Sequence, residues 1–432
     1  MIDSTLLLED FDNSARRLAR KGVSLDEVTA ARDALVERTE VLKRVEEMRA
    51  ERNRLSKEIG GLMGKGDKAG AEAAKARVAA LKTGLEENEA RQRELDEIAR
   101  DRLLRLPNFP DEAVPDGTDE SANVVLRMEG YDPADYRDRS FRPHWEVAGD
   151  LGIFDQDRAS KISGSMFAVL RGQGSKLLRA LVDFAFRLNE AVYEEHVVPS
   201  VVNSATFTGT GHLPKFETEA YRFRDDDLWA IPTGEVPLTG MHRDEILSGD
   251  QLPLRYMTHT SCFRREAGSA GKDTRGMQRL HEFHKVELVR LCRPEDVEAE
   301  FEGLLADAIR PIETLKLPYR VLGLCTGDLT FASTRTYDIE VYAPGTDRWL
   351  EVSSVGIFTD FQMRRSNIRF RRAAGERPEF PYALNGSGLA TPRVWAAIVE
   401  HYQQPDGTIR VPDALVEFMG TDVIDGRRPG GQ

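Results

Sequence analysis

The stretch Ser261–Val289, SCFRREAGSAGKDTRGMQRLHEFHKVELV, decides the fold class of this 432-residue chain. Its two ends belong to the segments Leu254–Glu266 and Phe283–Leu291, which are rich in apolar, β-branched and aromatic residues. Both segments are typical of β-strands, and a polar loop that contains glycines separates them. We therefore expect two antiparallel strands that place their side chains alternately on the two faces of a sheet.

This pair of strands carries a guanidinium, two carboxylates and an aromatic ring. By strand alternation Arg264 shares a face with Glu266, and Phe283 shares a face with Glu287. A guanidinium can donate two hydrogen bonds to a phosphate, and a phenylalanine ring can stack on a nucleotide base. An ordinary hairpin with surface ion pairs is the alternative for so short a motif. The loop adds glycines and cations that would let it close over a nucleotide: Gly268, Gly271, Lys272, Arg275, Gly276 and Arg279.

Outward from this motif, the residues from about 111 to 432 alternate short strands with a few helices. Tyr337–Tyr342 and Trp349–Ser354 predict a hairpin, with Ala343–Asp347 as its turn. The segment Tyr193–Pro199 predicts a strand that proline cuts short, and a final helix is expected after a turn at Asn385–Gly388. One amphipathic helix precedes these strands, with Leu177, Leu181, Phe184 and Leu188 on one side. The pattern predicts an α+β domain at 111–432, an antiparallel sheet with flanking helices.

The first 110 residues predict a different structure, a helical hairpin. A short helix over residues 1–25 comes first, and Leu25–Leu106 follows without a proline. The glycine-containing segment Gly60–Gly70 would join two antiparallel helices at a tip. Seam positions recur in steps of four and three, and they are apolar except for Arg52, Asn88 and Gln92. They are Val41, Val45, Met48, Arg52, Leu55, Ile59 and Leu62, then Ala74, Val78, Leu81, Leu85, Asn88, Gln92, Leu95 and Ala99.

The distribution of charge suggests what this hairpin binds. The chain has a net charge of −13, which argues against a general nucleic-acid-binding protein. The window Val41–Lys82 nevertheless holds eleven basic and six acidic residues, so it carries a charge of +5. A coiled coil used for dimerisation is the simpler interpretation. A long arm with a basic tip is also suited to a phosphate backbone.

Several other classes of protein are disfavoured. No apolar run approaches the ~20 residues that span a bilayer, and the N-terminus lacks the features of a signal peptide. Three widely spaced cysteines, Cys262, Cys292 and Cys325, fit neither a zinc knuckle nor a disulfide framework. We therefore expect a cytoplasmic protein.

The Ser261–Val289 stretch resembles motif 2 of bacterial-type seryl-tRNA synthetases, which are class II aminoacyl-tRNA synthetases, over its full length. The helical hairpin looks like the tRNA-binding arm of that family. Ile231–Leu238 (IPTGEVPL) resembles its TxE loop, and Leu384–Arg393 (LNGSGLATPR) is similar to motif 3. Pro199 stands where motif 1, a dimer-interface element, ends. The resemblance spans nearly the whole chain in the order of the family.

The resemblance implies activation of serine with ATP to seryl-adenylate and transfer to the 3′ end of tRNA(Ser). It implies ATP and Mg²⁺ as cofactors, a homodimer, and a tRNA with a long variable arm. Arg264 would hold the ATP α-phosphate and the substrate carboxylate, and Arg393 would contact the γ-phosphate side. Glu266 and Phe283 would fix the adenine. Glu351 and Ser354 would serve the Mg²⁺ ion. Plain alternation would put them on opposite faces, so a bulge or the strand end near Ser354 must intervene if both bind one ion.

For the amino acid, the resemblance implies that Thr233 and Glu235 bind the α-amino group and that Glu287 accepts a hydrogen bond from the serine hydroxyl. Strand alternation would put Thr233 and Glu235 on one face. Arg264, Ala383 and Asn385 complete the expected amino-acid site. The residues expected to bind tRNA lie on the hairpin: Arg52, Arg54, Lys57, Lys65 and Lys68.

The chain departs from the family around the amino-acid side chain. Family members usually carry Thr where this chain has Ala383, Ala where it has Gly234, and Ser-Ser-Cys-Ser-Asn where it has Ser353–Ile357. An alternative is therefore a paralogue that activates another small amino acid for tRNA or carrier loading in a biosynthetic pathway. A non-catalytic tRNA-binding protein and a carrier-protein ligase are further alternatives.

Overall fold

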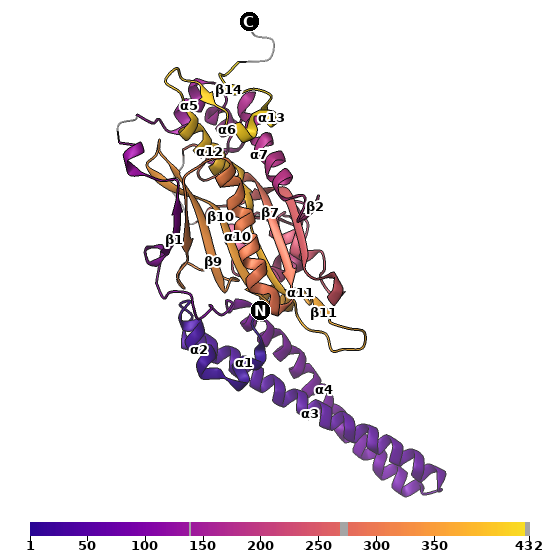
Figure 1. Cartoon of the computed structure of the whole chain (residues 1–432). Coiled ribbons are helices and arrows are strands. Elements are labelled where there is room, and N and C mark those ends of the chain that lie inside the picture. The colour runs from indigo at the N-terminus through magenta and orange to yellow at the C-terminus, as the bar shows by residue number, and fades with distance from the viewer. Residues whose placement is uncertain (138–139, 268–274, 428–432) are drawn as a thin grey trace. The chain divides into compact units, whose positions relative to one another are not determined.

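The computed structural model describes residues 1–137, 140–267 and 275–427. The chain divides into two compact units, Met1–Pro107 and Asn108–Gln432. Each unit has its own kind of secondary structure, helices in the first and a sheet with helices in the second (Figure 1).

The first unit is entirely helical in its regular structure. The expected single helix over residues 1–25 is two helices, because the chain leaves helical geometry at Asp10 (φ −138°, ψ 60°). The side chain of Asp3 caps the first helix by accepting a hydrogen bond from the Thr5 N–H at 3.0 Å. The helices are α1 (Ser4–Glu9), α2 (Phe11–Ala19), α3 (Leu25–Gly64) and α4 (Lys68–Arg105).

Helices α3 and α4 form the predicted hairpin, and local hydrogen bonds fix its ends. Ser24 and Glu27 make a capping box at the start of α3, with the Glu27 N–H donating to Ser24 Oγ at 3.3 Å. The turn is tighter than the expected segment Gly60–Gly70. Gly66 takes a positive φ of 78°, which glycine adopts at little cost. Asp67 then caps α4 by accepting a hydrogen bond from the Gly70 N–H at 2.9 Å.

The apolar seam of the hairpin has the predicted register, with one exception. Val41, Val45 and Leu55 of α3 are buried, as are Leu85 and Leu95 of α4. The prediction of a polar seam position at Arg52 was wrong, because its side chain is exposed. An exposed guanidinium stays hydrated, whereas a place in the seam would require its desolvation.

The second unit is built on an eight-stranded sheet that confirms the predicted α+β class (Figure 1). Neighbouring strands are antiparallel, except that β2 runs parallel to β6 at one edge. In spatial order the strands are β1 (Val124–Glu129), β8 (Tyr319–Gly323), β9 (Arg335–Ala343), β10 (Arg348–Thr359), β12 (Tyr382–Ala390), β7 (Glu282–Cys292), β6 (Leu254–Phe263) and β2 (Glu194–His196).

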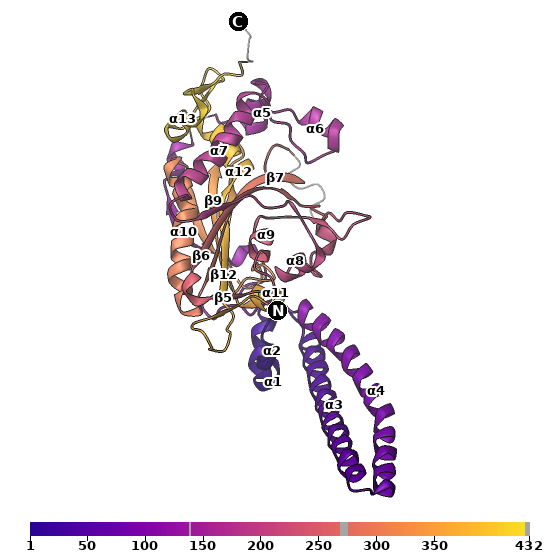
Figure 2. The same cartoon turned by 90° about the vertical axis from the view of Figure 1, so that its right-hand side faces the viewer.

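Helices cover both faces of this sheet. Helices α7 (Gln173–Asn189) and α10 (Val297–Thr314) lie on one face, and α8 (Ser204–Gly209) and α9 (Glu235–Gly240) lie on the other (Figure 2). The core under α7 and α10 includes the fully buried rings of Phe301, Tyr319 and Trp395. The remaining helices are α5 (His144–Asp150), α6 (Gln156–Ser163), α11 (Phe361–Ser366), α12 (Thr391–Tyr402) and α13 (Val416–Met419).

Three small ribbons complete the regular structure of the described ranges. They pair β3 (Val201–Val202) with β4 (Trp229–Ala230), β5 (Ile246–Ser248) with β11 (Arg369–Arg371), and β13 (Ile409–Arg410) with β14 (Val423–Ile424). None of the helices in the described ranges has the length and apolar character that crossing a membrane requires.

The expectation of a turn at Asn385–Gly388 was wrong, because these residues lie within the central strand β12. The glycines serve close packing between strands. A Cβ atom at Gly386 would lie 2.9 Å from Val355 Cγ2 on β10, and one at Gly388 would lie 3.1 Å from Leu288 Cγ on β7. Helix α12 begins at Thr391, directly after the strand. The strand thus delivers Asn385 to the sheet surface and leads straight into the helix that carries Arg393.

Candidate active site

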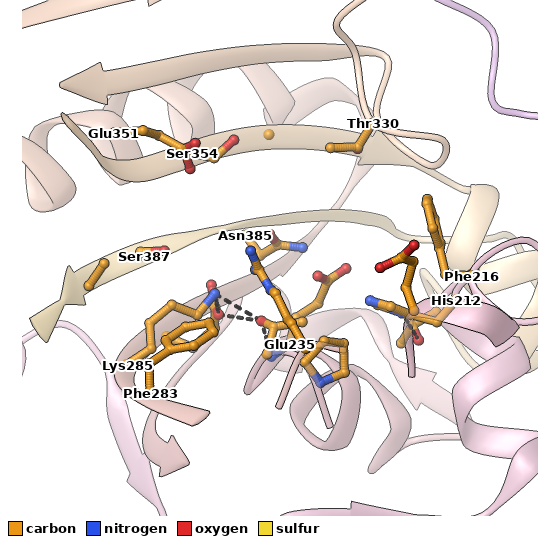
Figure 3. Close-up of a pocket in the computed structure, with 18 of the residues that line it drawn as sticks. His212, Phe216, Glu235, Phe283, Lys285, Thr330, Glu351, Ser354, Asn385 and Ser387 are labelled. Atoms are coloured by element: carbon orange, nitrogen blue, oxygen red, sulfur yellow. Dashed lines mark hydrogen bonds and ion pairs between the residues drawn. The ribbon is translucent and has the colours of Figure 1, made fainter. Parts of the chain in front are cut away.

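A cavity of about 450 Å³ lies over the sheet face that α9 covers. Strands β7, β10 and β12 form its floor, and the segment before α9 forms one wall. Figure 3 shows Glu351 and Ser354 on one strand and Asn385 and Ser387 on the next. The expected ligand-binding residues that line this cavity are Thr233, Glu235, Arg264, Glu266, Phe283, Glu287, Glu351, Ser354, Asn385 and Arg393.

At one end of the cavity, Arg264 and Phe283 are in direct contact. The guanidinium carbon of Arg264 lies 5.1 Å from the centre of the Phe283 ring, a distance typical of a cation–π pair. Strand β6 ends at Phe263, so the prediction that Arg264 and Glu266 share a strand face was wrong. A hydrogen bond from the Arg264 N–H to the His281 carbonyl oxygen, at 2.9 Å, continues the pairing irregularly.

Glu266 lies beyond the strand in a left-handed conformation (φ 51°), which turns the chain toward the cavity. Its Oε2 accepts a hydrogen bond from Arg279 at 2.5 Å. Arg279 therefore belongs to this end of the cavity, together with Glu266. The expected loop residues Gly268, Gly271 and Lys272 lie outside the described residues.

The β-bulge expected beside Ser354 lies at Val352. Glu351 pairs with Glu340 of β9 whereas Ser353 pairs with Ile339, so Val352 is the extra residue of β10. The shift lets both Glu351 and Ser354 reach the cavity. Arg393 of α12 lies against Glu351, donating from Nη1 to its carbonyl oxygen at 2.6 Å and lying 3.5 Å from Oε2.

At the other end of the cavity, three polar side chains and one backbone N–H form a buried network. Thr233 Oγ1 donates to Glu287 Oε2 at 2.5 Å and accepts from Lys285 Nζ at 3.0 Å. Lys285 also forms an ion pair with Glu287, and the side chains of both are less than one-tenth exposed. The N–H of Glu235 donates to Thr233 Oγ1 at 3.2 Å. The dashed lines in Figure 3 mark the contacts of Lys285.

Lys285 is a cavity residue that the sequence reasoning missed. It lies two residues before Glu287 on β7, so the alternation rule applied to Glu287 would have placed it on the same face. Strand alternation fails for Thr233 and Glu235, because Thr233 lies in a turn and Glu235 begins α9. The turn nevertheless brings both side chains to the cavity.

The carboxyl group of Glu235 has a strongly shifted pKa. Burial and the nearby charge of Glu287 raise the pKa of Glu235 to about 7. Gln362 of α11 opposes the shift by donating to Glu235 Oε1 at 2.5 Å. The charge of Lys285 and a hydrogen bond with Asn385 also lower the pKa. A carboxyl group with such a pKa is half ionised near neutral pH, and a cation placed beside it would favour its ionised form.

A half-buried histidine, His212, lies in the cavity wall, and no sequence pattern had pointed to it. Desolvation, together with the charges of Arg264, Lys285 and Arg365, lowers the pKa of His212 to about 3. Its ring stacks on Phe207, with centroids 5.0 Å apart. His212 is therefore neutral at physiological pH, and Thr210 Oγ1 lies 2.9 Å from its Nδ1.

The residues that depart from the family pattern lie mostly outside the cavity. Val355 and Ile357 are buried in the core and Ala383 is 1% exposed, and none of the three lines the cavity. Within the run Ser353–Phe358, alternation along β10 brings Ser354, Gly356 and Phe358 to the cavity surface. The residues expected to bind the amino acid therefore all line this cavity, except for Ala383.

The expected tRNA-binding residues lie on the hairpin and are all exposed: Arg52, Arg54, Lys57, Lys65 and Lys68. Arg54 forms ion pairs with Glu51 and Glu58 of its own helix. For Lys57, Lys65 and Lys68, no ion pair with another described residue is present. These three cations are therefore available to an external anion.

Comparison with known proteins links both units to one family. Residues 1–110 match the family model of the seryl-tRNA synthetase N-terminal domain. Residues 216–402 match the tRNA synthetase class II core domain (G, H, P, S and T). The two matches lie in the hairpin region and in the region that contains the cavity.

Whole-length relatives agree with these matches. A serine–tRNA ligase of Thermosynechococcus vestitus is 45% identical over 99% of this chain and all of its own length. A serine–tRNA ligase of Dehalococcoides mccartyi is 51% identical over 77% of this chain and 80% of its own. The crystal structure of seryl-tRNA synthetase from Pyrococcus horikoshii complexed with ATP superposes with a TM-score of 0.91 at 35% identity, over 98% of this chain and 99% of its own. The chain therefore belongs to the seryl-tRNA synthetase family of class II aminoacyl-tRNA synthetases.

Proposed function

We propose that this enzyme activates serine with ATP, releasing pyrophosphate, and transfers the seryl group to the 3′ end of tRNA(Ser). The observation that carries the proposal is the composition of one cavity. Arginines and an aromatic ring line one end, and a buried carboxylate network lines the other. A nucleotide and a small zwitterion can therefore meet in this cavity.

The chemistry requires positioning and charge stabilisation rather than a protein nucleophile. The serine carboxylate attacks the α-phosphorus of ATP and displaces pyrophosphate. The terminal ribose hydroxyl of tRNA then attacks the carbonyl carbon of the adenylate, forms the ester and displaces AMP. Arg264 is suited to the α-phosphate, because its guanidinium lies at the end of the cavity beside Phe283. Phe283 would stack on the adenine and Glu266 would accept its hydrogen bond, while Arg393 would face the distal phosphates.

The residues at the β10 bulge fit a magnesium ion. Glu351 and Ser354 supply a carboxylate and a hydroxyl, the oxygen ligands that Mg²⁺ prefers, and Glu351 is 47% exposed toward solvent. Among the described residues, no group of three or more His, Cys, Asp or Glu side chains is placed to hold a metal. A site with so few protein ligands suits a Mg²⁺ ion that ATP phosphates also hold, where it would neutralise phosphate charge.

For serine, the proposal assigns the two buried carboxylates to different groups. Glu235 and Thr233 would bind the α-ammonium group, since the ionised form of Glu235 is favoured by an adjacent cation. Glu287 would accept the hydrogen bond of the serine hydroxyl. Lys285 and Thr233 already hold one oxygen of Glu287 and leave the other, Oε1, for the substrate.

The helical arm would bind tRNA through its basic tip. Lys57, Lys65 and Lys68 offer exposed cations to a phosphate backbone, which fits a tRNA whose long variable arm extends from the body of the molecule. Because charged tRNA is used by ribosomes, we propose that the enzyme works in the cytoplasm.

We further propose a homodimer, because both edges of the large sheet expose apolar side chains. Val197, directly after the edge strand β2, is 97% exposed. At the opposite edge, Val124, Val125, Leu126 and Met128 of β1 are each more than 40% exposed. Apolar sheet edges in an isolated chain invite pairing with another chain, and a second copy could cover them.

ATP–pyrophosphate exchange with the purified enzyme tests the activation step. The reaction would contain one amino acid at a time, drawn from serine, the other proteinogenic amino acids and 2,3-diaminopropionate. We expect serine to give the dominant signal. A stronger signal from another amino acid would refute the assignment to serine and revive the paralogue alternative, which the relatives named serine–tRNA ligase do not favour.

A further inference from the structure

Gly234 lies between the two proposed ligands of the ammonium group, in contact with the strand behind it. A Cβ atom added at Gly234 would lie 2.7 Å from Thr258 Cγ2 and 3.0 Å from Glu287 Cβ. The first distance is far shorter than the ~3.5–4.0 Å at which carbon atoms make favourable contact. An alanine at position 234 therefore does not fit while Thr258 keeps its place.

Thr258 has little freedom to move away. It is fully buried on β6, directly opposite Glu287 of β7 in the strand register. Its β-branched side chain is stiff at χ1. Its Oγ1 has no hydrogen-bond partner among the described residues. The contact with Gly234 is made by its methyl group, so the shape of Thr258 rather than its hydroxyl matches this site.

The same spot is connected to the amino-acid network. Thr233, directly before Gly234, donates a hydrogen bond of 2.5 Å to Glu287, and Glu235 follows directly after Gly234. Any displacement of position 234 away from β6 and β7 would lengthen the hydrogen bond to Glu287 and move the carboxyl group of Glu235.

We infer that Gly234 and Thr258 are a coupled pair of positioning residues, in which the Thr258 methyl group fills the space that a side chain at 234 would need. The pair sets the distance between the segment Thr233–Glu235 and Glu287. The usual alanine of the family at position 234 is then replaced for steric reasons rather than to change the substrate. The inference rests on the proposed activation of serine.

Three variants test the pairing by pyrophosphate exchange with serine: Gly234→Ala alone, the same change with Thr258→Ser, and the same change with Thr258→Val. The Thr258→Ser change removes the colliding methyl group and keeps the hydroxyl, whereas the Thr258→Val change keeps a methyl group there and removes the hydroxyl. The single Thr258 variants provide the references for the two double variants. Thermal unfolding of each variant accompanies the kinetics.

We expect Gly234→Ala to raise the KM for serine roughly tenfold, the upper end of what one net hydrogen bond contributes, with a KM for ATP within about twofold of the parent. Thr258→Ser should restore the KM for serine to within about threefold, since the approach to Glu287 Cβ remains. Thr258→Val should restore nothing. A general loss of structure would instead change the KM for serine and the KM for ATP together. It would also affect the double variants with Thr258→Ser and with Thr258→Val equally.

Two results would overturn the pairing. One is a Gly234→Ala enzyme with the parental KM for serine. The other is equal behaviour of the two double variants, and this comparison still decides the matter if the single variant does not fold. The unmodified enzyme is measured first: no exchange with serine would refute the proposed function, whereas an active parent with unaffected variants would refute only the pairing.

Discussion

At the scale of single residues, Glu235 and Glu287 place two buried carboxyl groups close together, and among the described residues Lys285 is the cation that forms an ion pair with Glu287. Burial and the charge of Glu287 raise the pKa of Glu235 to about 7. The free enzyme therefore has one cationic partner fewer than its carboxylates require. The ammonium group of a bound amino acid would supply that partner and favour the ionised form of Glu235.

This imbalance predicts a pH dependence of serine use. Below about pH 7 Glu235 is protonated and neutral, so kcat/KM for serine should fall as the pH is lowered, approaching tenfold per unit. The measurement is pyrophosphate exchange between pH 5.5 and 8.5, with kcat/KM for ATP at saturating serine as the internal reference. The Glu235→Gln enzyme should lose this inflection. A serine profile with no inflection between pH 6 and 8 would contradict the role of Glu235.

The raised pKa of Glu235 affects stability in the opposite direction: raising the pH favours use of serine but lowers the free energy of unfolding. A carboxyl group whose pKa is raised in the folded state binds its proton more tightly there than in the unfolded chain. Its contribution to the free energy of unfolding is therefore lost as the pH rises from about 4.5 to about 7. The enzyme gains an ionisable ligand for serine at some cost in stability at neutral pH.

Many of the residues that line the cavity could be predicted from the sequence, but the local structure that brings them there differs in part from the prediction. The resemblance pointed to Arg264 and Thr233, and strand alternation was the expected cause of their placement. The structure uses an irregular strand end for Arg264 and a turn for Thr233. Local periodicity describes regular strands only, so it could not predict contacts that a turn makes with a distant strand. Lys285 could have been found by alternation from Glu287, whereas the position of His212 depends on tertiary packing.

At the scale of elements, a buried charge cluster ties the sheet to α10. Arg290 of β7 donates to the Tyr193 hydroxyl at 2.8 Å, to Glu300 Oε2 at 2.8 Å and to Asp307 Oδ2 at 2.5 Å. Its side chain is 4% exposed. Both carboxylates belong to α10, and Tyr193 lies directly before β2, so one arginine joins three elements.

Removing this arginine should destabilise the catalytic unit. In the Arg290→Met variant the carboxylates of Glu300 and Asp307 lose their most buried partner, and breaking such a pair costs about 3–5 kcal/mol. Differential scanning calorimetry should show a clearly lower transition temperature for this unit. Lys316→Ala, which removes an ion pair with Asp413 in which both side chains are more than 60% exposed, is the control and should leave the transition almost unchanged. Equal transition temperatures for the two variants would contradict the account of the cluster.

Element types were predicted better than element boundaries. The hairpin Arg335–Ala343 to Arg348–Thr359 and the bulge beside Ser354 agree with expectation. The run Asn385–Gly388 was predicted as a turn because glycines usually mark one. In β12 they instead relieve crowding between neighbouring strands, which depends on side chains such as Val355 and Leu288. No local sequence pattern shows those contacts.

At the scale of the whole molecule, the chain joins a helical arm with a basic tip to a larger unit that contains the candidate active site. The acidic charge of the chain as a whole, −13, would repel nucleic acid, so the exposed cations of the arm would have to provide the attraction. The proposed division of labour places tRNA binding on the arm and adenylate formation in the second unit.

Neutralising the tip should separate these two activities. Replacing Lys57, Lys65 and Lys68 by alanine should raise the KM for tRNA at least tenfold and reduce the salt dependence of tRNA binding by about one unit of slope per lysine. Serine-dependent pyrophosphate exchange should stay at the parental level. The control replaces Lys75 and Lys82, which pair with Glu72 and Glu86 of the same helix. Equal effects of the two sets on tRNA binding would argue against a specific role of the tip.

The most direct measurement is transfer of radiolabelled serine to tRNA by the purified enzyme in the presence of ATP and Mg²⁺. We predict that the enzyme charges tRNA(Ser) with serine to a plateau set by the amount of that tRNA, and that tRNAs lacking a long variable arm remain uncharged. Formation of seryl-adenylate without transfer to any tRNA, or charging with another amino acid in preference to serine, would contradict the central claim.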